Sequence, residues 1–296
     1  MATRGMTYSI VARDASTGQF GVAVQSKYFG VGAVVPWAEP GVGAIATQAM
    51  ADPAVGISHG PLGLDLMRGG KSAPDTLRAL LAADDGREQR QIGIVDRQGS
   101  VAAHTGAQCI AEAGHHAGEG YSCQANIMLR DTVWAAMAAA FESSEGPLAD
   151  RLLAALDAAE EEGGDARGRQ SAALLVVPAE GRRWDKVVDL RVEDHPQPLA
   201  ELRRLLELKR IYVRYEQIVA RLLGGDAEAV AEIGALRGDI EFEFTHALAL
   251  AAWGRVEEAR QIFKAVCARE PGWKQMPSRY AAAGGIPSSV ADLLSD

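Results

Sequence analysis

Short runs of apolar residues, separated by turn-forming residues, occupy most of the chain up to residue 191. Runs of this length that are bounded by Gly, Pro, Asp or Ser predict β-strands. The apolar residues follow one another almost without interruption, so we expect strands that are buried on both faces. The predicted strands are 7–14, 20–26, 31–36, 42–47, 91–96, 100–105, 121–128, 171–177 and 186–191.

Helical periodicity interrupts the strands twice, at 59–68 with 73–83 and at 131–143 with 148–161. Ser72 is a suitable N-cap for the second of these helices. The order along the chain is strands, helix pair, strands, helix pair, strands. Two antiparallel sheets with a helix pair outside each would bury every apolar face. The sequence therefore predicts an α+β fold, a four-layer αββα sandwich.

The segment 195–198, with two prolines, breaks this pattern and marks a predicted domain boundary. We expect an αββα domain over 1–195 and a small all-α domain over 199–296, where only helical periodicity remains. The helices predicted in the second domain are 199–223, 227–237, 241–253 and 256–269.

The last two of these helices resemble a tetratricopeptide-type hairpin. Gly254, Ala259, Phe263 and Pro271 stand at that repeat's spacing for its mid-turn glycine, packing alanine, aromatic residue and closing proline. Glu243 replaces the tryptophan of the repeat. A single repeat cannot bury its own apolar face, so we expect this hairpin to pack on neighbouring helices or on a protein partner.

Composition narrows the class of protein. Hydrophobic residues are 48% and charged residues 23%, and the net charge of −9 argues against a nucleic-acid partner. The N-terminus has no apolar signal core, and no run of about 18 apolar residues occurs, so we expect a cytoplasmic protein without a membrane partner. The three cysteines are far apart and the histidines complete no ligand set, so we expect neither disulfide, metal nor cofactor.

Thr7 follows Met6 at the start of the first predicted strand. In a chain that begins at Thr7, this residue carries a nucleophile and a base, because its hydroxyl attacks a carbonyl and its free α-amine takes the proton. An α-amine titrates at about pH 8, so it can accept a proton at neutral pH. With residues 1–5 attached, the amine is an amide and cannot act as a base. The simpler interpretation is a threonine that only favours the strand.

Gln25, Ser26 and Lys27 end the second predicted strand, which forms a hairpin with the first. This strand resembles the one beside the nucleophile of proteasome-type N-terminal nucleophile hydrolases. The charge of Lys27 would lower the pKa of the Thr7 amine or hydroxyl, and Asp165 would orient the ammonium. The alternatives are a solvent-facing lysine and a polar surface loop.

Other polar residues are candidates for substrate binding. Gln48 and Asn126 end buried strands, and such amides can donate to an oxyanion, although they more often satisfy backbone groups. Arg167 and Arg169 would bind a substrate carboxylate. The full set of substrate-binding candidates is Gln25, Gln48, Asn126, Arg167, Arg169, Gln170 and Ser171.

Taken together, the segments 6–12, 22–26, 41–48, 90–96 and 165–173 resemble the bacterial family called domain of unknown function 1028, which is described as N-terminal-nucleophile-hydrolase-like. The resemblance implies the αββα fold and an amidohydrolase. It also implies that the C-terminal helices correspond to a module labelled peptidoglycan-binding, a label that the missing export signal does not fit. The chain departs from the family in its residues before Met6, and from the proteasome in having Glu39 in place of the catalytic lysine.

Three hypotheses follow. The leading one is an amidohydrolase that cleaves a small amide or peptide-like substrate through Thr7, with Ser26, Lys27 and Asp165 as supporting catalytic residues. The second is a non-catalytic binding or scaffold protein on the same fold, with 199–296 as its partner-binding module. The third is a cysteine-dependent enzyme, for which no base lies near Cys109 or Cys123 in the sequence. Exposed sheet edges and the helical tail favour a homo-oligomer.

Overall fold

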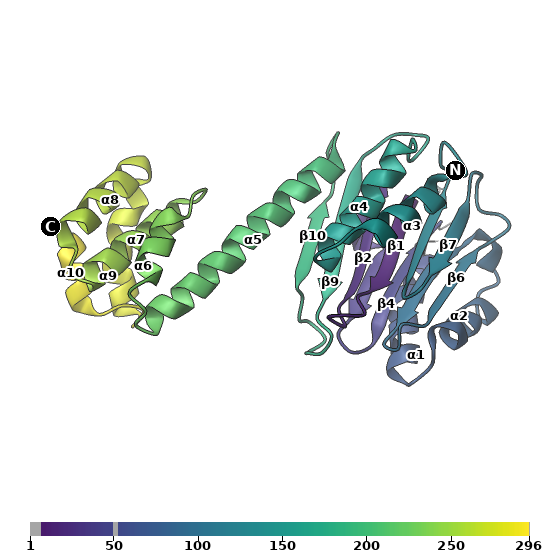
Figure 1. The fold of residues 1–296 in the computed structure, drawn as a ribbon, viewed down its shortest axis with the longest axis horizontal. Helices are drawn as coiled ribbons and strands as arrows, with labels where there is room; N and C mark the ends of the chain where they lie inside the picture. The colour runs from purple at the N-terminus through teal and green to yellow at the C-terminus, as the bar shows by residue number, and fades with distance from the viewer. Residues whose placement is uncertain (1–6, 50–52, 296) are drawn as a thin grey trace. The chain divides into compact units, whose positions relative to one another are not determined.

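The computed structural model describes residues 7–49 and 53–295, and Figure 1 shows its ribbon. It divides into two compact units, Met1–Leu206 and Glu207–Asp296. The division falls inside helix α5 (Pro198–Leu223), later than the boundary predicted at 195–198. The reason is that Leu202 and Leu206, in the first turns of α5, belong to the hydrophobic core of the first unit.

The first unit contains two antiparallel sheets. The six-stranded sheet has the order β10-β9-β2-β1-β8-β7, and the four-stranded sheet has the order β3-β4-β5-β6. The strands are β1 (Thr7–Arg13), β2 (Phe20–Ser26), β3 (Pro36–Glu39), β4 (Gly43–Gln48), β5 (Gln91–Asp96), β6 (Val101–Thr105), β7 (Gly114–Gly118), β8 (Tyr121–Asn126), β9 (Ser171–Val177) and β10 (Val188–Val192).

Two helix pairs pack against these sheets. Alternation along β1 sends Tyr8 and Ile10 into a core shared with α3 (Val133–Ser143) and α4 (Leu148–Glu161), which lie across the strands in Figure 1. Val11, on the other face of β1, packs in a core that joins the two sheets. The far face of the four-stranded sheet is covered by α1 (Pro53–Arg68) and α2 (Ala73–Ala82). The predicted α+β fold with two antiparallel sheets and a helical C-terminal region is confirmed.

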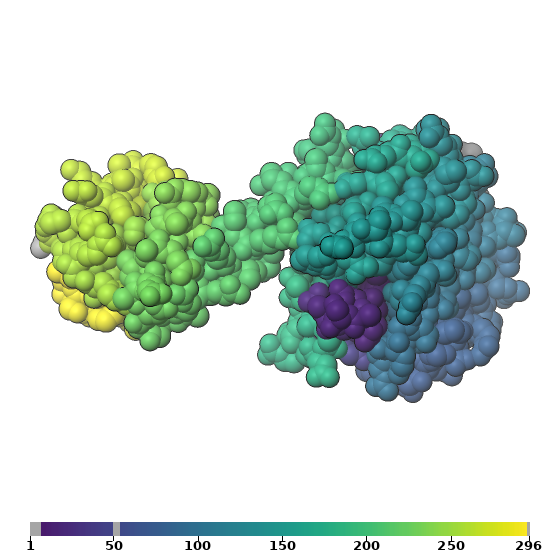
Figure 2. Space-filling model, in the orientation of Figure 1, coloured from purple at the N-terminus to yellow at the C-terminus, as the bar shows by residue number. Residues whose placement is uncertain are grey.

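The central strands are buried on both faces, as their continuous apolar runs predict. Every residue of β2 is buried, as is every residue of β1 except Arg13. In Figure 2, the purple colour of this part of the chain reaches the visible face only as one small patch. Burial on both faces leaves solvent no direct access to polar side chains in the middle of these strands.

The prediction of a strand over 31–36 was wrong. Val31–Ala33 forms a 3₁₀ turn, and the strand begins only at Pro36. Gly30 precedes the turn with a left-handed backbone (φ 66°), which glycine adopts readily. Val31 still enters the core between the sheets, so the apolar run is buried without forming a strand.

Two elements of the first unit differ from the prediction: α1 is longer, and β7 was not predicted. Helix α1 begins at Pro53, six residues earlier than predicted, and the glycines within the predicted range are packing sites rather than breaks. A side chain at Gly60 or Gly63 would collide with Trp37 or Ile45 of the sheet below. Strand β7 was not among the predicted strands, since glycine and histidine are weak strand formers, and its pairing with β8 stabilises it.

The second unit is entirely helical among its described residues. Its helices after α5 are α6 (Ala229–Ala235), α7 (Ile240–Ala252), α8 (Val256–Arg269), α9 (Met276–Ala282) and α10 (Ser288–Ser295), with a 3₁₀ turn at Pro271–Gln275. Buried Phe242 and Phe244 centre its core, where Phe244 contacts the rings of Trp273 and Tyr280. Helices α9 and α10 were not predicted. None of the helices in the described ranges is both long enough and apolar enough to span a membrane.

Candidate functional site

Thr7 lies at the start of β1, near the middle of the six-stranded sheet. Its neighbours across the sheet are Ser26 on β2 and Asn126 on β8. Only 2% of its surface is exposed. The Thr7 hydroxyl donates a hydrogen bond to Ser26 Oγ at 3.1 Å. The predicted pairing of Thr7 with Ser26 through the first hairpin is therefore present, and it fixes the direction of the Thr7 side chain.

The backbone carbonyl of Thr7 is held by the two amide side chains proposed as oxyanion donors. Gln48 Nε2, from the facing sheet, donates to Thr7 O at 3.1 Å, and Asn126 Nδ2 donates to the same oxygen at 3.4 Å. Gln48 and Asn126 are almost completely buried. The structure therefore brings both residues to Thr7, but their nitrogens hold the backbone of the nucleophile candidate.

Gln91 links these two amides and was not identified from the sequence. Its Oε1 accepts from Gln48 Nε2 at 2.7 Å and from Asn126 Nδ2 at 2.9 Å. Its own Nε2 donates to the carbonyl of Ala125 at 2.9 Å. Gln91 lies directly opposite Gln48 in the pairing of β4 with β5. Gln48 and Asn126 contact Thr7 directly, and Gln91 orients both of these amides from behind.

The polar layer continues along the same strands. Ser9 Oγ donates to Gln48 Oε1 at 2.6 Å, and Gln124 Nε2 donates to Ser9 Oγ at 2.7 Å. Ser9 lies two residues after Thr7, and Gln124 lies two residues before Asn126, so period-two spacing places each pair on one face. That spacing was the signal in the sequence that would have found them. A side chain at Gly93 would collide with Gln124 Oε1, so glycine lets the sheets approach here.

Asp165 anchors the 165–170 loop to the end of β2. Its Oδ2 accepts from the backbone nitrogen of Lys27 at 2.9 Å and from Arg167 Nη2 at 3.1 Å. Lys27 Nζ donates to the carbonyl of Arg169 at 3.4 Å. Lys27, the residue after Ser26, is thus in contact with Asp165. The Asp165 carboxylate contacts the loop and the backbone of Lys27, the residue that follows β2.

Gln25 lies on the opposite face of the six-stranded sheet from Ser26 and Thr7, and Arg169, in the loop before β9, contacts the same acidic residue as Gln25. The side-chain amide of Gln25 lies 2.9 Å from Glu160 Oε2, to which it donates when its nitrogen is turned toward this oxygen, and Arg169 forms an ion pair with the same carboxylate group. Tyr8 also donates to Glu160 Oε2 at 2.5 Å. Burial and the adjacent Glu160 carboxylate raise the pKa of Tyr8 well above its ordinary value. These residues tie β1 and β2 to α4 and do not surround the Thr7 hydroxyl.

Ser171 and Gln170 also contact groups other than Thr7. Ser171 Oγ donates to the carbonyl of Tyr28 at 2.5 Å and accepts from Val31 N at 3.1 Å. Gln170 Nε2 donates to Asp194 at 3.0 Å on the surface. Ser171 therefore shapes the turn that follows Lys27, and Gln170 joins two surface segments.

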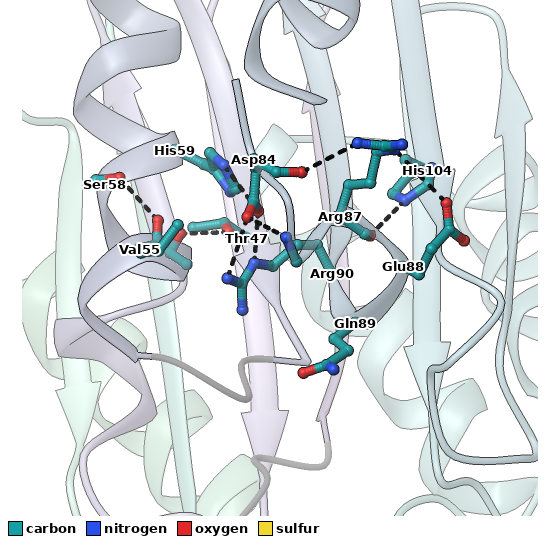
Figure 3. Close-up of polar contacts among 12 residues, drawn as sticks. Thr47, Val55, Ser58, His59, Asp84, Arg87, Glu88, Gln89, Arg90 and His104 are labelled. Atoms are coloured by element: carbon teal, nitrogen blue, oxygen red, sulfur yellow. Dashed lines mark hydrogen bonds and ion pairs between the residues drawn. The ribbon is translucent and has the colours of Figure 1, made fainter. Parts of the chain in front are cut away.

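A second buried polar cluster lies behind the network, on the outer face of the four-stranded sheet. Figure 3 shows His59, Asp84 and Arg90 turned toward one another. Asp84 Oδ2 is 2.7 Å from Arg90 Nε and 3.4 Å from His59 Nε2. Burial lowers the pKa of His59, which the charge of Arg90 reinforces and that of Asp84 opposes. The Asp84 pKa is lowered, because hydrogen bonds from Arg90 and Gly86 outweigh its burial.

This cluster anchors the strands that carry the network. Arg90 immediately precedes Gln91, and Thr47, which donates to the carbonyl of Gly56 in α1 at 2.8 Å, immediately precedes Gln48. The outward side chains of Thr47 and Arg90 thus connect these strands to α1 and to Asp84. Their neighbours Gln48 and Gln91 point inward and hold Thr7.

The cysteines do not offer a comparable site. Cys123 is completely buried, and burial raises its pKa; burial also raises the pKa of Cys109. A raised pKa leaves less of the reactive thiolate at neutral pH, which disfavours a cysteine nucleophile. Across residues 7–49 and 53–295, no three His, Cys, Asp or Glu side chains are grouped closely enough to hold a metal ion.

Comparison with known proteins places this geometry in a family. The sequence profile of the "Family of unknown function (DUF1028)" matches residues 7–202. The chain belongs to this family. The crystal structure of the DUF1028 protein SPO2555 from Silicibacter pomeroyi is 31% identical, covering 68% of this chain and 88% of that chain, with a TM-score of 0.61. The predicted DUF1028 resemblance is confirmed.

Other comparisons add little for this DUF1028 protein. Anbu (ancestral beta-subunit) from Yersinia bercovieri is 12% identical, over 71% of this chain and 97% of that chain, and its TM-score of 0.34 is too low for an argument from fold. No curated protein matches. The DUF1028 match begins at Thr7 and includes all residues of the polar network.

Proposed function

We propose that this DUF1028 protein is an amidohydrolase of the N-terminal nucleophile type, with Thr7 as the nucleophile once it is the first residue of the chain. One observation carries the proposal: a buried threonine at the start of a central strand, with its hydroxyl held by Ser26 and its carbonyl by Gln48 and Asn126. Residues 1–6 lie outside the described residues, so the state of the Thr7 amine belongs to the proposal.

The fold assignment is part of the same proposal. The domain is taken to be an αββα sandwich of the N-terminal-nucleophile type. The core that joins the two sheets, and the helix pairs on their outer faces, support this assignment. In such a sandwich, the space between the sheets at the start of β1 is where substrate would meet Thr7.

The proposed reaction needs no group beyond the chain and water. The free α-amine of Thr7 takes the proton of Oγ1, and Oγ1 attacks the carbonyl carbon of the amide. The tetrahedral intermediate collapses, the C–N bond breaks and the amine passes the proton to the leaving nitrogen. Water, deprotonated by the same amine, then attacks the ester carbonyl carbon. The bond from this carbon to Thr7 Oγ1 breaks, the acid is released, and the amine returns the proton to Oγ1. The substrate class is a small amide or peptide-like molecule.

The supporting residues have separate roles in this proposal. Ser26 fixes the direction of the Thr7 hydroxyl, and Gln48 with Asn126 fixes its backbone. Lys27 and Asp165 shape the wall beyond Ser26. Arg167, whose side chain is about one-third exposed beside Asp165, is placed to meet a substrate carboxylate.

Labelling by an electrophile tests the proposal. A chain made to begin at Thr7 is treated with a β-lactone, which acylates a reactive N-terminal threonine, and its intact mass is measured. We expect one adduct, located at Thr7 by peptide mapping, and none in Thr7→Ala. The matched control is Thr17→Ala, which removes an exposed threonine from the β1–β2 turn and keeps the adduct. Labelling at another residue, or equal labelling of Thr7→Ala, would contradict the proposal.

A binding or scaffold role on the same fold is the second candidate, and one observation favours it. The helical unit, proposed to be tetratricopeptide-like, has an apolar cavity that is partly open to solvent. A binding role predicts that Thr7 stays blocked by preceding residues in the native protein, whereas the hydrolase predicts a free Thr7 amine. The cavity lining does not favour a polar glycan, so the peptidoglycan-binding label receives no support from it.

A further inference from the structure

The second unit contains a cavity of about 510 Å³ between the end of α5, helix α7, helix α9 and the segment 285–290. Its lining combines aromatic and aliphatic side chains, with Phe244, Leu248 and Val290 among them. None of the described residues that line it carries a formal charge. The cavity is partly open to solvent, and a mostly apolar pocket of this kind is the usual form of a small-molecule site.

The rim of the cavity is apolar as well. Leu223 is 78% exposed and Trp253 is 37% exposed, and both line the cavity. They are the exposed large hydrophobic residues found among the described part of the second unit. Exposed apolar area is therefore concentrated at this one opening. Such a concentration marks a binding site more often than scattered exposed residues do.

The hydroxyl groups in the cavity wall are hydrogen-bonded within the protein and do not require a polar ligand. Tyr215 Oη and Thr245 Oγ1 are 2.9 Å apart and hydrogen-bond to each other. Tyr215 Oη also donates to Glu241 Oε1 at 3.5 Å, so the hydrogen-bonding capacity of this hydroxyl is used within the protein. A charged ligand would lose its hydration without meeting a counter-charge among the lining residues, and the Glu241 carboxylate behind Tyr215 would repel an anion. An uncharged alkyl chain would exchange water for aromatic and aliphatic contacts.

We propose that this cavity binds an uncharged, apolar small molecule, of the class represented by a medium-length alkyl alcohol. The volume falls within the range of about 300–1,000 Å³ typical of small-molecule sites. A protein partner is less well matched, because protein interfaces have a polar rim, and no charged residue stands among the exposed lining residues Leu223, Ala252, Trp253, Gly285 and Pro287. This inference does not depend on the proposed role of Thr7.

Nile red fluorescence with the full 296-residue chain tests the proposal. We expect saturable binding at one dye per chain, displaced by 1-decanol. Decanedioate, which has the same chain length and a charge at each end, should displace the dye at least about ten-fold less well. Absence of saturable binding, or equal displacement by decanedioate, would overturn the proposal.

Two matched variants locate the site. Ala252 lines the cavity and is exposed at the end of α7, so Ala252→Glu adds a charge there and should weaken dye binding at least about ten-fold. Ala268 is exposed near the end of α8 and lies outside the lining, so Ala268→Glu should leave binding unchanged. Leu223→Gln, at a position too exposed to disturb folding, should weaken it about three-fold. Equal binding by all three variants would contradict this location.

Size-exclusion chromatography distinguishes the remaining occupant, a second copy of the chain. The proposal predicts the same oligomeric state for the wild type and for Ala252→Glu. A wild-type dimer that becomes monomeric in Ala252→Glu, but not in Ala268→Glu, would show that another protomer covers the cavity, and the small-molecule proposal would fail.

Discussion

The layer between the two sheets has an apolar part and a polar part, although the same strands build both. Strand β1 places Val11 in the apolar part and Thr7 in the polar part. Strand β5 does the same with Val95 and Gln91, both on its inward face. The two parts are equally buried, so burial alone does not explain their chemistry.

The difference lies in what each part contributes. Burying a valine side chain stabilises the fold by about 1.5–3 kcal/mol. A buried hydrogen bond gives only about 0.5–1.5 kcal/mol net, and a lost partner costs about 1–3 kcal/mol. The polar part therefore adds little stability for its size, while it restricts the orientation of every group within it. We interpret the apolar part as the source of stability and the polar part as the support of Thr7.

The largest expected effect is on hydrolysis, not on folding. In a chain that begins at Thr7, Thr7→Ala should reduce the rate of amide hydrolysis by about 10³-fold or more, because no other group would carry the acyl intermediate. Thr17→Ala should hydrolyse like the wild type. The measurement is kcat/KM on a substrate found by screening amides, and an unchanged value in Thr7→Ala would remove Thr7 from the mechanism.

The next effect concerns the charged cluster behind the polar part. Asp84→Ala should lower the free energy of unfolding by about 3–5 kcal/mol, because it leaves the buried guanidinium of Arg90 without its counter-charge. Asp65→Ala removes an exposed partner of Arg68 and should cost less than about 1 kcal/mol. Urea unfolding gives the loss of unfolding free energy for each variant, and hydrogen exchange then shows whether the loss is located in β5. Equal small losses would mean that Asp84 does not anchor this strand.

A pair of variants on β5 compares the two parts directly. Gln91→Leu leaves the amides of Gln48 and Asn126 without their acceptor and should cost about 1–3 kcal/mol. Val95→Ala, on the same face, should cost about 1.5–3 kcal/mol. Only Gln91→Leu should also slow hydrolysis, by about 10²-fold, because Thr7 loses its alignment. Similar rates in both variants would end the distinction between the two parts.

The smallest effect is a pH dependence from His59. Its pKa is lowered in the folded protein, chiefly by burial, so the unfolded chain binds a proton first as the pH falls below about 6.5. Stability should therefore decrease with falling pH, by at most about 1.4 kcal/mol per pH unit from this residue. His59→Gln should flatten the slope between pH 7 and pH 5. Part of the pH dependence should remain in this variant, because the pKa values of His115 and His246 are also lowered. An unchanged slope would contradict this role.

Local patterns could predict much of the fold. The β1–β2 and β5–β6 hairpins follow from a turn between two apolar runs, and the Ser72 cap follows from its residue type, with its hydroxyl accepting from Asp75 N. The 3₁₀ turn at Val31–Ala33 could not be predicted in this way. It depends on Ser171, which is distant in sequence and accepts from Val31 N.

The site shows the same limit. The contact between Thr7 and Ser26 is local to one hairpin, and the sequence predicts it. Gln91 reaches Thr7 only through the pairing of β4 with β5 and the packing of one sheet on the other, which no local pattern contains. Gln25 was predicted as a substrate-binding residue, yet its neighbour Ser26 points toward Thr7. Alternation in a strand sends adjacent side chains to opposite faces, so that argument was already available from the sequence.

The most direct test of the account is the N-terminal sequence and intact mass of the protein purified from its own cell. The account predicts a chain that begins at Thr7, with a free α-amine beside the hydroxyl that Ser26 orients. A chain that begins at Met1 or Ala2 would keep the Thr7 nitrogen in a peptide bond. The hydrolase mechanism would then be contradicted, and the polar network would have to be explained by binding.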